Sequence, residues 1–479
     1  MNQDQSIRSS PPAGRKPGPQ EAPAAPLYEV HKKIYPRSVT GWFANWRWAL
    51  VWLTQLLFYG LCWLPWNGRQ AVLFDLVERK FYIFGLIFWP QDVIYLSVLL
   101  IIAAYGLFLF TAIGGRLFCG YACPQTVYTE IFVWIEEKIE GSRSTRMKLD
   151  RQPMNARKLA LKTAKNAVWI AFAFWTGFTF VGYFTPIRTL SLSVLNFSLG
   201  PWETFWVVFY GFATYGNAGY MREQVCKYMC PYARFQSVMF DPDTLIVTYD
   251  SERGEPRGAR SKKLDHKDAG KGDCVDCGIC VQVCPTGIDI RKGLQYECIG
   301  CSACVDACDQ VMDKMQYPRG LIRYSTEHAI EEHWGRKEIL AHLIRPRIVI
   351  YGAILACIVI AGAYGIATRL PLKVDVIRDR NSLSREVDNG LIENLYRLQI
   401  MNVSEAKHSY AISVSGLDGI DIASERTVEV PAAGARVVLV PVRVPPESGK
   451  KGSNRIYFDV KAVGDENVAV HEKATFLMP

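Results

Sequence analysis

The sequence predicts a polytopic α-helical membrane protein with about five transmembrane helices, a small cysteine-rich domain and a C-terminal immunoglobulin-like β-sandwich. Three observations support this prediction. Hydrophobic residues make up 49% of the 479 residues and gather in long runs, although 21% of the chain is charged. Twelve of the 14 cysteines fall in four tight motifs, which indicates metal or redox chemistry rather than disulfides. Beyond residue 370 the apolar residues alternate as in short strands.

The N-terminal residues 1–40 are expected to form a disordered cytoplasmic tail. Residues 1–28 are rich in Pro, Ala, Gly, Gln and Ser and show no apolar period. No signal peptide is expected, because the first apolar run begins only near Phe43 and no small-residue cleavage site follows it.

Five segments are long and apolar enough to cross a bilayer as helices, which takes about 20 residues. The second and fifth carry no charged residue, whereas Gly211, Gly216 and Gly219 dilute the fourth. Four segments are expected to form two hairpins within a membrane region at 41–220, and the fifth lies at 348–368. The segments are residues 43–64, 93–113, 167–184, 202–220 and 348–368.

The distribution of basic residues predicts the orientation. The loop 116–166, the N-terminal tail and the cysteine-rich region are basic, whereas the loops 65–92 and 185–203 are not. Basic segments stay in the cytoplasm. The N-terminus and residues 221–347 are therefore expected inside a multi-pass bacterial inner membrane, and residues 369–479 in the periplasm. The net charge of +9 then reflects topology, not nucleic-acid binding.

The cysteine-rich region repeats the spacing C-x-x-C-x-x-C-x-x-x-C. This spacing predicts a cytoplasmic bacterial-type ferredoxin domain with two [4Fe–4S] clusters, in which the fourth cysteine of each run binds the other cluster. Two zinc sites are the alternative, but zinc motifs use C-x-x-C pairs with a longer spacer. Asp309 stands where a second proline is common and removes no ligand. The predicted ligands are Cys274, Cys277, Cys280 and Cys308 for one cluster, and Cys284, Cys298, Cys301 and Cys304 for the other.

Two further motifs of the form Cys-x-x-x-Cys-Pro follow the second and fourth segments. Cys119 and Cys123 precede Pro124, and Cys226 and Cys230 precede Pro231. Each proline disfavours helix at the cysteine before it, and both motifs are expected at the cytoplasmic face. The four thiols are predicted to converge on one site, where soft thiolates select Cu(I), zinc or an iron–sulfur centre.

Several weaker features accompany these motifs. Met221 and Met229 could add thioether ligands, although packing is the simpler role. For the two cysteine motifs themselves, the alternative is that they are coincidental pairs of buried cysteines. Cys62 and Cys357 lie alone in apolar runs and are expected to be small buried hydrophobes. Arg47 and Glu203 lie near segment ends, from which they can reach the membrane interface.

The remaining loops also carry local signals. Residues 125–140 show a helical apolar stripe, with Glu136, Glu137 and Lys138 expected on the polar side. This helix is predicted to lie on the membrane surface or on the ferredoxin unit. Residues 325–347, with His328, His333 and His342, are expected to form a helical lead-in to the last segment, with the histidines facing solvent rather than a metal. Residues 89–92, Trp-Pro-Gln-Asp, indicate a periplasmic turn.

Seven short strands separated by turn residues predict the β-sandwich. This part has no cysteine or histidine cluster and equal numbers of basic and acidic residues, so an interaction module is expected. The predicted strands are residues 373–378, 395–402, 409–414, 426–430, 436–444, 455–460 and 469–477.

The order of these parts resembles the CcoG/FixG/RdxA family of accessory proteins for cytochrome cbb3-type oxidase assembly. Trp89-Pro90-Gln91-Asp92 and the stretch 317–324, YPRGLIRY, add to the resemblance, which covers nearly the whole chain after the tail. The family implies cytoplasmic reduction of Cu(II) to Cu(I) for the haem–copper centre of the oxidase, hence a cupric reductase activity, two [4Fe–4S] clusters and copper as metal. Cys119, Cys123, Cys226 and Cys230 would then be the catalytic copper site.

Two other functions remain open. The chain is also similar to NapH-like quinol-dehydrogenase subunits, which lack the sandwich. That resemblance implies an electron conduit between quinol and a redox partner. The paired cysteines would then hold another iron–sulfur centre or only brace the helices. A non-enzymatic copper-handling scaffold is the third reading. The expected partners are the membrane, an unknown electron donor, and either oxidase assembly factors or a copper transporter. No nucleic acid is expected, and a homo-oligomer is an open alternative.

Overall fold

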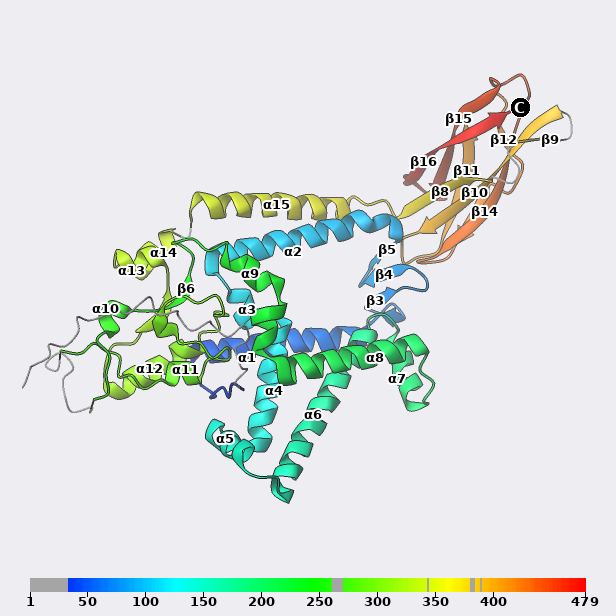
Figure 1. Cartoon of the computed structure of the whole chain (residues 1–479). Coiled ribbons are helices and arrows are strands. Elements are labelled where there is room, and N and C mark those ends of the chain that lie inside the picture. The colour runs from blue at the N-terminus through cyan, green and yellow to red at the C-terminus, as the bar shows by residue number, and fades with distance from the viewer. Residues whose placement is uncertain (1–32, 261–269, 343, 380–383, 388–389) are drawn as a thin grey trace, which may run out of the picture.

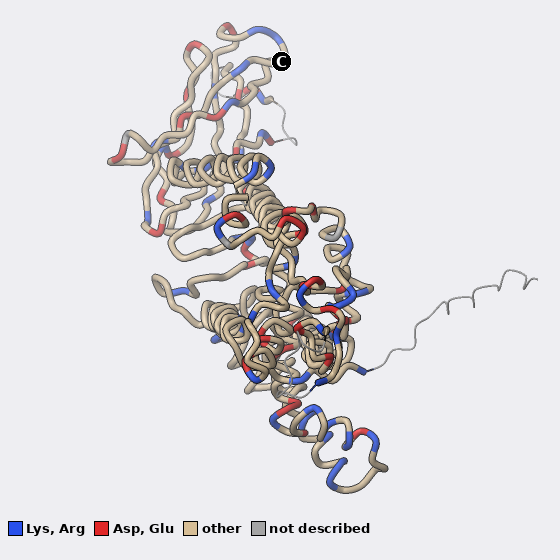
Figure 2. The backbone as a smooth tube through the Cα atoms, turned by 90° about the vertical axis from the view of Figure 1, so that its left-hand side faces the viewer, with Lys and Arg blue, Asp and Glu red and all other residues tan. Residues whose placement is uncertain are grey.

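The structure is a computed structural model that describes residues 33–260, 270–342, 344–379, 384–387 and 390–479. Figure 1 shows an elongated molecule. The ferredoxin unit lies at one end, the β-sandwich at the other, and the long helices run between them. In Figure 2 charged residues are frequent in the loops and short elements, while most of the long-helix backbone is uncharged.

Each of the five predicted segments is a helix in the structure. Two stretches, Pro90–Gly114 and Pro346–Ala367, are long and apolar enough to cross a membrane by length and composition. Helix α6 begins well before its predicted segment, because the Asn155 side chain accepts a hydrogen bond from Lys158 N and caps it. The long helices are α1 (Trp42–Gly60), α2 (Val93–Gly114), α6 (Ala156–Val181), α8 (Pro201–Thr214), which continues as the π-helix η3 (Tyr215–Met221), and α15 (Pro346–Ala367).

The helices pair differently from the predicted two hairpins. The second hairpin is present, since α6 packs along α8, and Gly177 lets the two backbones approach closely at Val207. Helix α2, however, packs mainly on α15 rather than on α1. Tyr95 Oη donates to Gly365 O at 2.9 Å, and the small Gly362 faces Val98. The glycines of α15 therefore decide the partner of α2, which span order alone did not predict.

A small layer of short strands that the sequence did not predict separates α1 from α2. It packs on the sandwich through Ile87 and Trp89 against Met401 and Val403. The predicted turn at 89–92 is present as η2 (Pro90–Asp92), and it also binds the sandwich, since Gln91 donates to Asp375 at 2.8 Å and Lys373 pairs with Asp92. The other elements here are η1 (Leu61–Trp63), the strand pair β1 (Pro65–Trp66) and β2 (Arg69–Gln70), the sheet of β3 (Val72–Asp75), β4 (Lys80–Ile83) and β5 (Leu86–Phe88), and α7 (Ile187–Leu195).

The predicted amphipathic helix is α4 (Pro124–Glu140), but Glu136 does not lie on a polar face. Its side chain is fully buried and pairs with Arg222 at 2.8 Å and Arg146 at 3.2 Å. A buried carboxylate is tolerated only with such partners. The neighbouring elements are α3 (Leu117–Tyr121), α5 (Arg143–Arg151), the π-helix η4 (Val225–Met229) and α9 (Pro231–Ser237).

The ferredoxin unit combines several helices with one two-stranded sheet. The predicted helical lead-in at 325–347 is instead a strand end followed by two short helices. The elements are β6 (Ile246–Tyr249), which pairs with β7 (Ile322–Ser325), α10 (Ser251–Gly254), α11 (Ile279–Gln282), η5 (Ile290–Lys292), α12 (Ala303–Met315), α13 (Glu327–Glu331) and α14 (Arg336–His342).

Residues 1–32 of the predicted disordered tail lie outside the described residues. Residues 33–40 are held in place, which corrects the prediction for this stretch. Arg37 N donates to Gln282 O of the ferredoxin unit at 2.9 Å, and Tyr35 Oη donates to Asp150 at 2.5 Å. The segment therefore joins the ferredoxin unit to α5.

The C-terminal part is the predicted β-sandwich, and all seven predicted strands are present. Two short strands, β9 (Arg385–Val387) and β12 (Asp421–Ile422), are additional. One sheet has the order β12–β14–β10–β8 with β9 on β10, and the other has the order β13–β11–β15–β16. The predicted strands are β8 (Leu372–Arg378), β10 (Leu391–Asn402), β11 (His408–Ser415), β13 (Thr427–Val430), β14 (Ala435–Val444), β15 (Gly452–Ala462) and β16 (Asp465–Met478).

Candidate functional site

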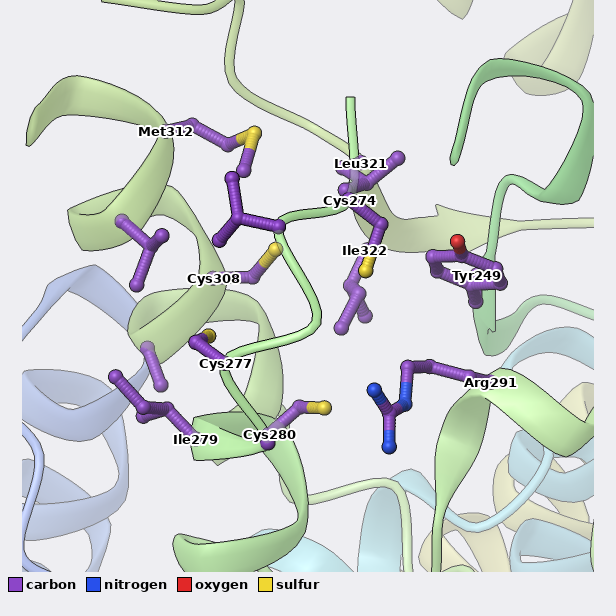
Figure 3. Close-up of a pocket in the computed structure, with 14 residues that line it drawn as sticks. Tyr249, Cys274, Cys277, Ile279, Cys280, Arg291, Cys308, Met312, Leu321 and Ile322 are labelled. Carbon is purple, nitrogen blue, oxygen red and sulfur yellow. The ribbon is translucent and has the colours of Figure 1, made fainter. Parts of the chain in front are cut away.

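The first predicted ring of thiols lines one cavity. Cys274, Cys277, Cys280 and Cys308 surround it together with Tyr249 and Arg291. Figure 3 shows the four cysteines around this space, with the Arg291 side chain beside Cys280. Cys308 comes from α12, in the second cysteine run, so the predicted exchange of the fourth ligand between runs agrees with this arrangement.

The second ring lines a separate cavity. Cys284, Cys298, Cys301 and Cys304 surround it, and Cys280 of the first ring also lines its wall. Burial raises the pKa of the Cys298 thiol to about 12, and it raises the pKa of Cys308 in the first ring to about 12 as well. Desolvated thiolates are stable only beside strong positive charge, which the iron of a bound cluster supplies.

The geometry of both rings fits a cubane better than zinc. Among the described residues, no three His, Cys, Asp or Glu side chains come close enough together to hold a single metal ion. A structural zinc site would bring four ligands to one ion at about 2.3 Å per sulfur, whereas a [4Fe–4S] cluster takes its thiolates at the separate corners of a cube. The eight predicted cysteines can therefore hold two clusters.

The other four motif cysteines lie near one another in a region that we call the paired-cysteine site: Cys119, Cys123, Cys226 and Cys230. The Cys119 thiol lies within electrostatic reach of the other three. As predicted, helix ends before the second cysteine of each motif, since Cys123 and Cys230 have extended backbones followed by proline-initiated helices. All four side chains are half-buried. The two motifs are therefore neighbours in the fold, although no three of their thiols, among the residues that the structure describes, come close enough together to hold a single metal ion.

Tertiary hydrogen bonds hold the two motifs together. Gln125, just after the first motif, donates to the carbonyl oxygens of Asn217 at 2.9 Å and Arg222 at 3.0 Å, just before the second. Gln236, just after the second motif, accepts from Cys119 Sγ at 3.2 Å and donates to Thr111 at 3.1 Å. Sequence reasoning missed both glutamines, although each follows a motif closely.

The paired-cysteine site touches the second ring directly. A Cβ placed on Gly120 would lie 2.8 Å from Ile299 O and 2.9 Å from Cys301 Cα, so only glycine allows this approach. Cys119 and Cys226 pack against the same buried cluster as Cys301 and Ala303. Burial raises the pKa of the Cys119 thiol to about 12 and that of Cys226 to about 11.

Arg47 also belongs to this region, contrary to the prediction that it reaches toward a membrane interface. Its side chain is buried and lies within electrostatic reach of Cys301, Glu130 and Asp306. Its Nε has no hydrogen-bond partner among the described residues. A buried guanidinium beside Cys301 favours extra negative charge on the second ring, which is what a reduced cluster carries.

The weaker ligand candidates do not join the site. Met229 is 57% exposed, and the three histidines have separate partners. His328 pairs with Asp243 at 2.8 Å, His333 lies 3.7 Å from Glu252, and His342 stacks on Trp334. Cys62 is buried as predicted, but Cys357 is exposed on α15, which corrects that prediction.

Three known sequence families match parts of the chain. A family described as "4Fe-4S dicluster domain" matches residues 221–327, which include both rings and the second paired motif. A family described as "4Fe-4S binding domain" matches residues 96–141, which include Cys119 and Cys123. The family of the immunoglobulin-like fold at the C-terminus of FixG matches residues 362–479.

Curated relatives match most of the chain. Nitrogen fixation protein FixG of Rhizobium meliloti is 37% identical over 82% of this chain and 81% of its own length. Protein RdxA of Cereibacter sphaeroides is 36% identical over 87% of this chain and 89% of its own length. Protein RdxB of the same organism is 38% identical over 81% of this chain and 83% of its own length.

A solved structure matches a smaller part of the chain. The crystal structure of a FixG-related protein from Vibrio parahaemolyticus covers 22% of this chain and 95% of its own, with 23% identity and a TM-score of 0.21. The identity and coverage of the curated relatives, together with the dicluster and FixG C-terminal matches, establish the relationship. This chain belongs to the FixG/RdxA family of iron–sulfur proteins.

Proposed function

We propose that this protein reduces Cu(II) to Cu(I) and that copper binds as substrate at the paired-cysteine site. The observation that carries the proposal is the contact of Gly120 with the Cys301 loop, which puts these soft thiols beside the second ring. The clusters, when bound, supply single electrons, and one electron converts Cu(II) to Cu(I). Thiolates favour the Cu(I) product.

The residues around the site have defined tasks in this proposal. Gln125 and Gln236 keep the two motifs together, and Gly120 keeps them against the second ring. Because the thiols of Cys119 and Cys226 have raised pKa values, copper must displace their protons on binding. Half-burial leaves the thiols within reach of an incoming ion.

The test is a stopped-flow oxidation of dithionite-reduced protein by Cu(II), with a Cu(I) chelator as readout. We expect Cys119→Ser or Cys226→Ser to abolish Cu(I) formation while both clusters keep their spectra. Cys357→Ser is the matched control, because Cys357 is exposed and outside all motifs. Equal rates in the wild type and both motif variants would mean that copper is reduced elsewhere or directly by the clusters.

A second function has one observation in its favour. The iron–sulfur family match at residues 96–141 includes Cys119 and Cys123, which supports a further iron–sulfur centre at the paired-cysteine site and an electron-conduit role. Anaerobic metal analysis of a Cys226→Ser, Cys230→Ser double variant separates the two functions. If the iron content falls and copper reduction persists, the paired-cysteine site holds iron and is not where copper is reduced, and the first proposal fails.

The proposed setting is a bacterial inner membrane crossed five times, with the ferredoxin unit in the cytoplasm and the sandwich in the periplasm. The basic residues of the loop 116–166 support this orientation. A reporter fused after Pro479 should be active only outside the cytoplasm, and one inserted near Lys263 only inside. Both reporters active on one side would overturn it.

The proposed physiological role is copper supply for assembly of the haem–copper centre of cbb3-type cytochrome oxidase, with assembly factors or a copper transporter as partners. The sandwich is the expected docking module. A deletion strain that lost oxidase activity and regained it with added copper would support this role. Normal oxidase copper content in the deletion strain at low copper would contradict it.

A further inference from the structure

We infer that two buried arginines, Arg47 and Arg116, make the second ring the place where electrons collect, so that electrons enter at the first ring and leave from the second. This deepens the proposed function, on which it rests for the electron-transfer role but not for the copper chemistry. The two rings differ in their contact with water and in the charged groups beside them.

Arg116 lies between the second ring and the paired-cysteine site. It directly precedes α3, and its backbone packs on the loop of the second ring, since a Cβ on Gly300 would lie 3.3 Å from Arg116 C and O. The Arg116 side chain is 4% exposed and donates to Ala233 O of α9. Three thiols lie within electrostatic reach of its charge: Cys298 of the second ring, and Cys119 and Cys226 of the paired-cysteine site.

Arg47 approaches the second ring from helix α1. It lines a cavity together with Pro285 and Ala303, each of which is next to a ligand of the second ring in sequence. Its side chain is 7% exposed, and Cys301 lies within electrostatic reach of it. Two guanidinium groups therefore lie beside the second ring.

Neither arginine is neutralised by an ion pair with a carboxylate of the described residues. The Nε atoms of Arg47 and Arg116 are buried without a hydrogen-bond partner. Glu130 lies within electrostatic reach of Arg47 and of Cys301, but it forms no ion pair with the arginine. A guanidinium stays charged in proteins, so both arginines favour additional negative charge on the second ring.

The arginine beside the first ring is in a different state. Arg291, next to Cys280 in Figure 3, pairs with Asp276 at 2.5 Å and with Asp289 at 2.8 Å. Two carboxylates therefore outweigh its single positive charge.

Two further charged groups lie beside the first ring. Arg260 donates to the carbonyl oxygen of Cys274 at 3.5 Å, and the carboxyl group of Asp309 lies within electrostatic reach of Cys308. Together with Arg291 and its two partners, the first ring thus has two arginines and three carboxylates around it. This balance opposes the extra negative charge that the surroundings of the second ring favour.

Burial acts in the opposite direction. Cys277 of the first ring is exposed, whereas none of the four thiols of the second ring is. Removal from water disfavours a more negatively charged cluster, so burial alone would make the second ring the harder one to reduce. The unpaired arginines offset this penalty, because buried charges are little screened by water and salt.

The inferred step is the transfer of one electron from the first ring to the second. The reduced cluster of the first ring is oxidised, the cluster of the second ring is reduced, and no bond or proton moves. The exposure of Cys277 makes the first ring the side that an electron donor in solution can approach. The contact of Gly120 with the Cys301 loop makes the second ring the side from which the paired-cysteine site receives the electron.

Redox titrations of the full-length protein with both clusters bound, followed by electron paramagnetic resonance, test the role of the arginines. We expect two reduction potentials in the wild type. Arg116→Gln and Arg47→Gln should each shift the higher potential to a more negative value and leave the lower one in place. Arg291→Gln should shift only the lower potential, because it frees two carboxylates beside the first ring. Arg319→Gln is the matched control and should shift neither, since this arginine is 68% exposed.

Arg116→Lys separates the charge of the side chain from its packing. Lysine keeps the positive charge without the planar guanidinium, so the higher potential should return to near the wild-type value. Iron and sulfide analysis shows for each variant whether both clusters are bound. Arg47 and Arg116 come from different elements, so a variant that loses a cluster leaves the other one to decide.

A shift of the lower potential in Arg116→Gln or Arg47→Gln would overturn the inference, because the second ring would then be the harder one to reduce. Unchanged potentials in both variants would overturn it as well, and so would equal potentials in Arg116→Lys and Arg116→Gln. The titrations contain no copper, so failure of the copper assay alone would affect only the proposed function.

Discussion

The two kinds of cysteine site in this protein are built in different ways. The ferredoxin rings take all eight thiols from residues 274–308, and the four thiols that the cysteine spacing assigns to each cluster do line one cavity, with Cys280 lining both. The paired-cysteine site takes its thiols from two motifs about a hundred residues apart, each at the junction of two helices. One site is set by local chain geometry, and the other by packing.

This difference predicts that the two kinds of site respond differently to substitutions. A ring should fail when a ligand is lost, whereas the paired-cysteine site should also fail when a distant packing contact is lost. The contacts that matter for it are Gln125, Gly120 and the Glu136–Arg222 ion pair. The following variants test this contrast, from the largest expected effect to the smallest.

Loss of a ring ligand should have the largest effect. Cys277→Ser should remove the signal of one [4Fe–4S] centre and about half of the iron and sulfide, and it should weaken the other cluster because both share one small fold. Electron paramagnetic resonance and iron–sulfide analysis measure this. Unchanged iron and sulfide contents would contradict the ligand assignment, and Cys62→Ser serves as the control outside the motifs.

Glu136→Gln should cost about 3–5 kcal/mol in the free energy of unfolding, because it leaves Arg146 and Arg222 buried without their carboxylate. Arg222 lies just before the second paired motif, so the paired-cysteine site should be disturbed and the rings spared. Glu137→Gln on the same helix is the control, with a change within about 0.5 kcal/mol. Denaturant unfolding in detergent measures both, and equal effects would refute the role of the buried pair.

The same ion pair makes the protein sensitive to acid. Burial by itself would raise the pKa of Glu136, but Arg222, Lys33 and Arg146 outweigh it and hold the pKa below its ordinary value. Its stabilisation is therefore complete above the ordinary glutamate pKa and is lost as the pH falls through the lowered folded-state value. Glu136→Gln should show a smaller loss of stability on acidification than the wild type does.

Gly120→Val should separate the two sites without damage to either. The added side chain collides with Ile299 and Cys301, so the second ring must move away from the paired-cysteine site. We expect copper-driven oxidation to slow at least about tenfold, near 1.4 kcal/mol in barrier, with the iron content unchanged. Gly352→Val, at an open position in α15, is the control. A wild-type rate would show that this contact does not carry the electrons.

Asp306→Ala should have the smallest effect. Asp306 accepts hydrogen bonds from Phe43 N and Ala44 N, so it caps α1 from the ferredoxin unit. Loss of such a cap costs about 1 kcal/mol, and it should speed hydrogen exchange at the start of α1. Asp313, on the exposed side of α12, pairs with the surface residue Arg319, and Asp313→Ala should leave that exchange unchanged.

Much of this architecture could be predicted before the structure. The sandwich strands followed from their alternation, because its buried residues come from alternate positions such as Tyr396, Leu398 and Ile400 of β10. The five helices followed from apolar runs, and the ring ligands from spacing. Each of these signals is local, so a single sequence contains it completely.

The predictions that failed concern residues whose partners come from distant parts of the chain. Glu136 and Arg47 look like surface charges in sequence, but Arg222 and the second ring lie beside them. Residues 33–40 fall in the predicted tail because they precede the first apolar run, but Asp150 and Gln282 bind them. Helix α2 precedes its paired motif as expected, yet the glycines of α15 decide its packing partner.

The sequence by itself therefore determined the eight ring ligands, the two paired motifs and the order of the domains, because cysteine spacing and hydrophobic period act over a few residues. Only the tertiary structure decided that the two motifs lie together and that Gly120 brings them against the Cys301 loop. These contacts join residues far apart in the chain, and long-range packing leaves no fixed spacing in a single sequence.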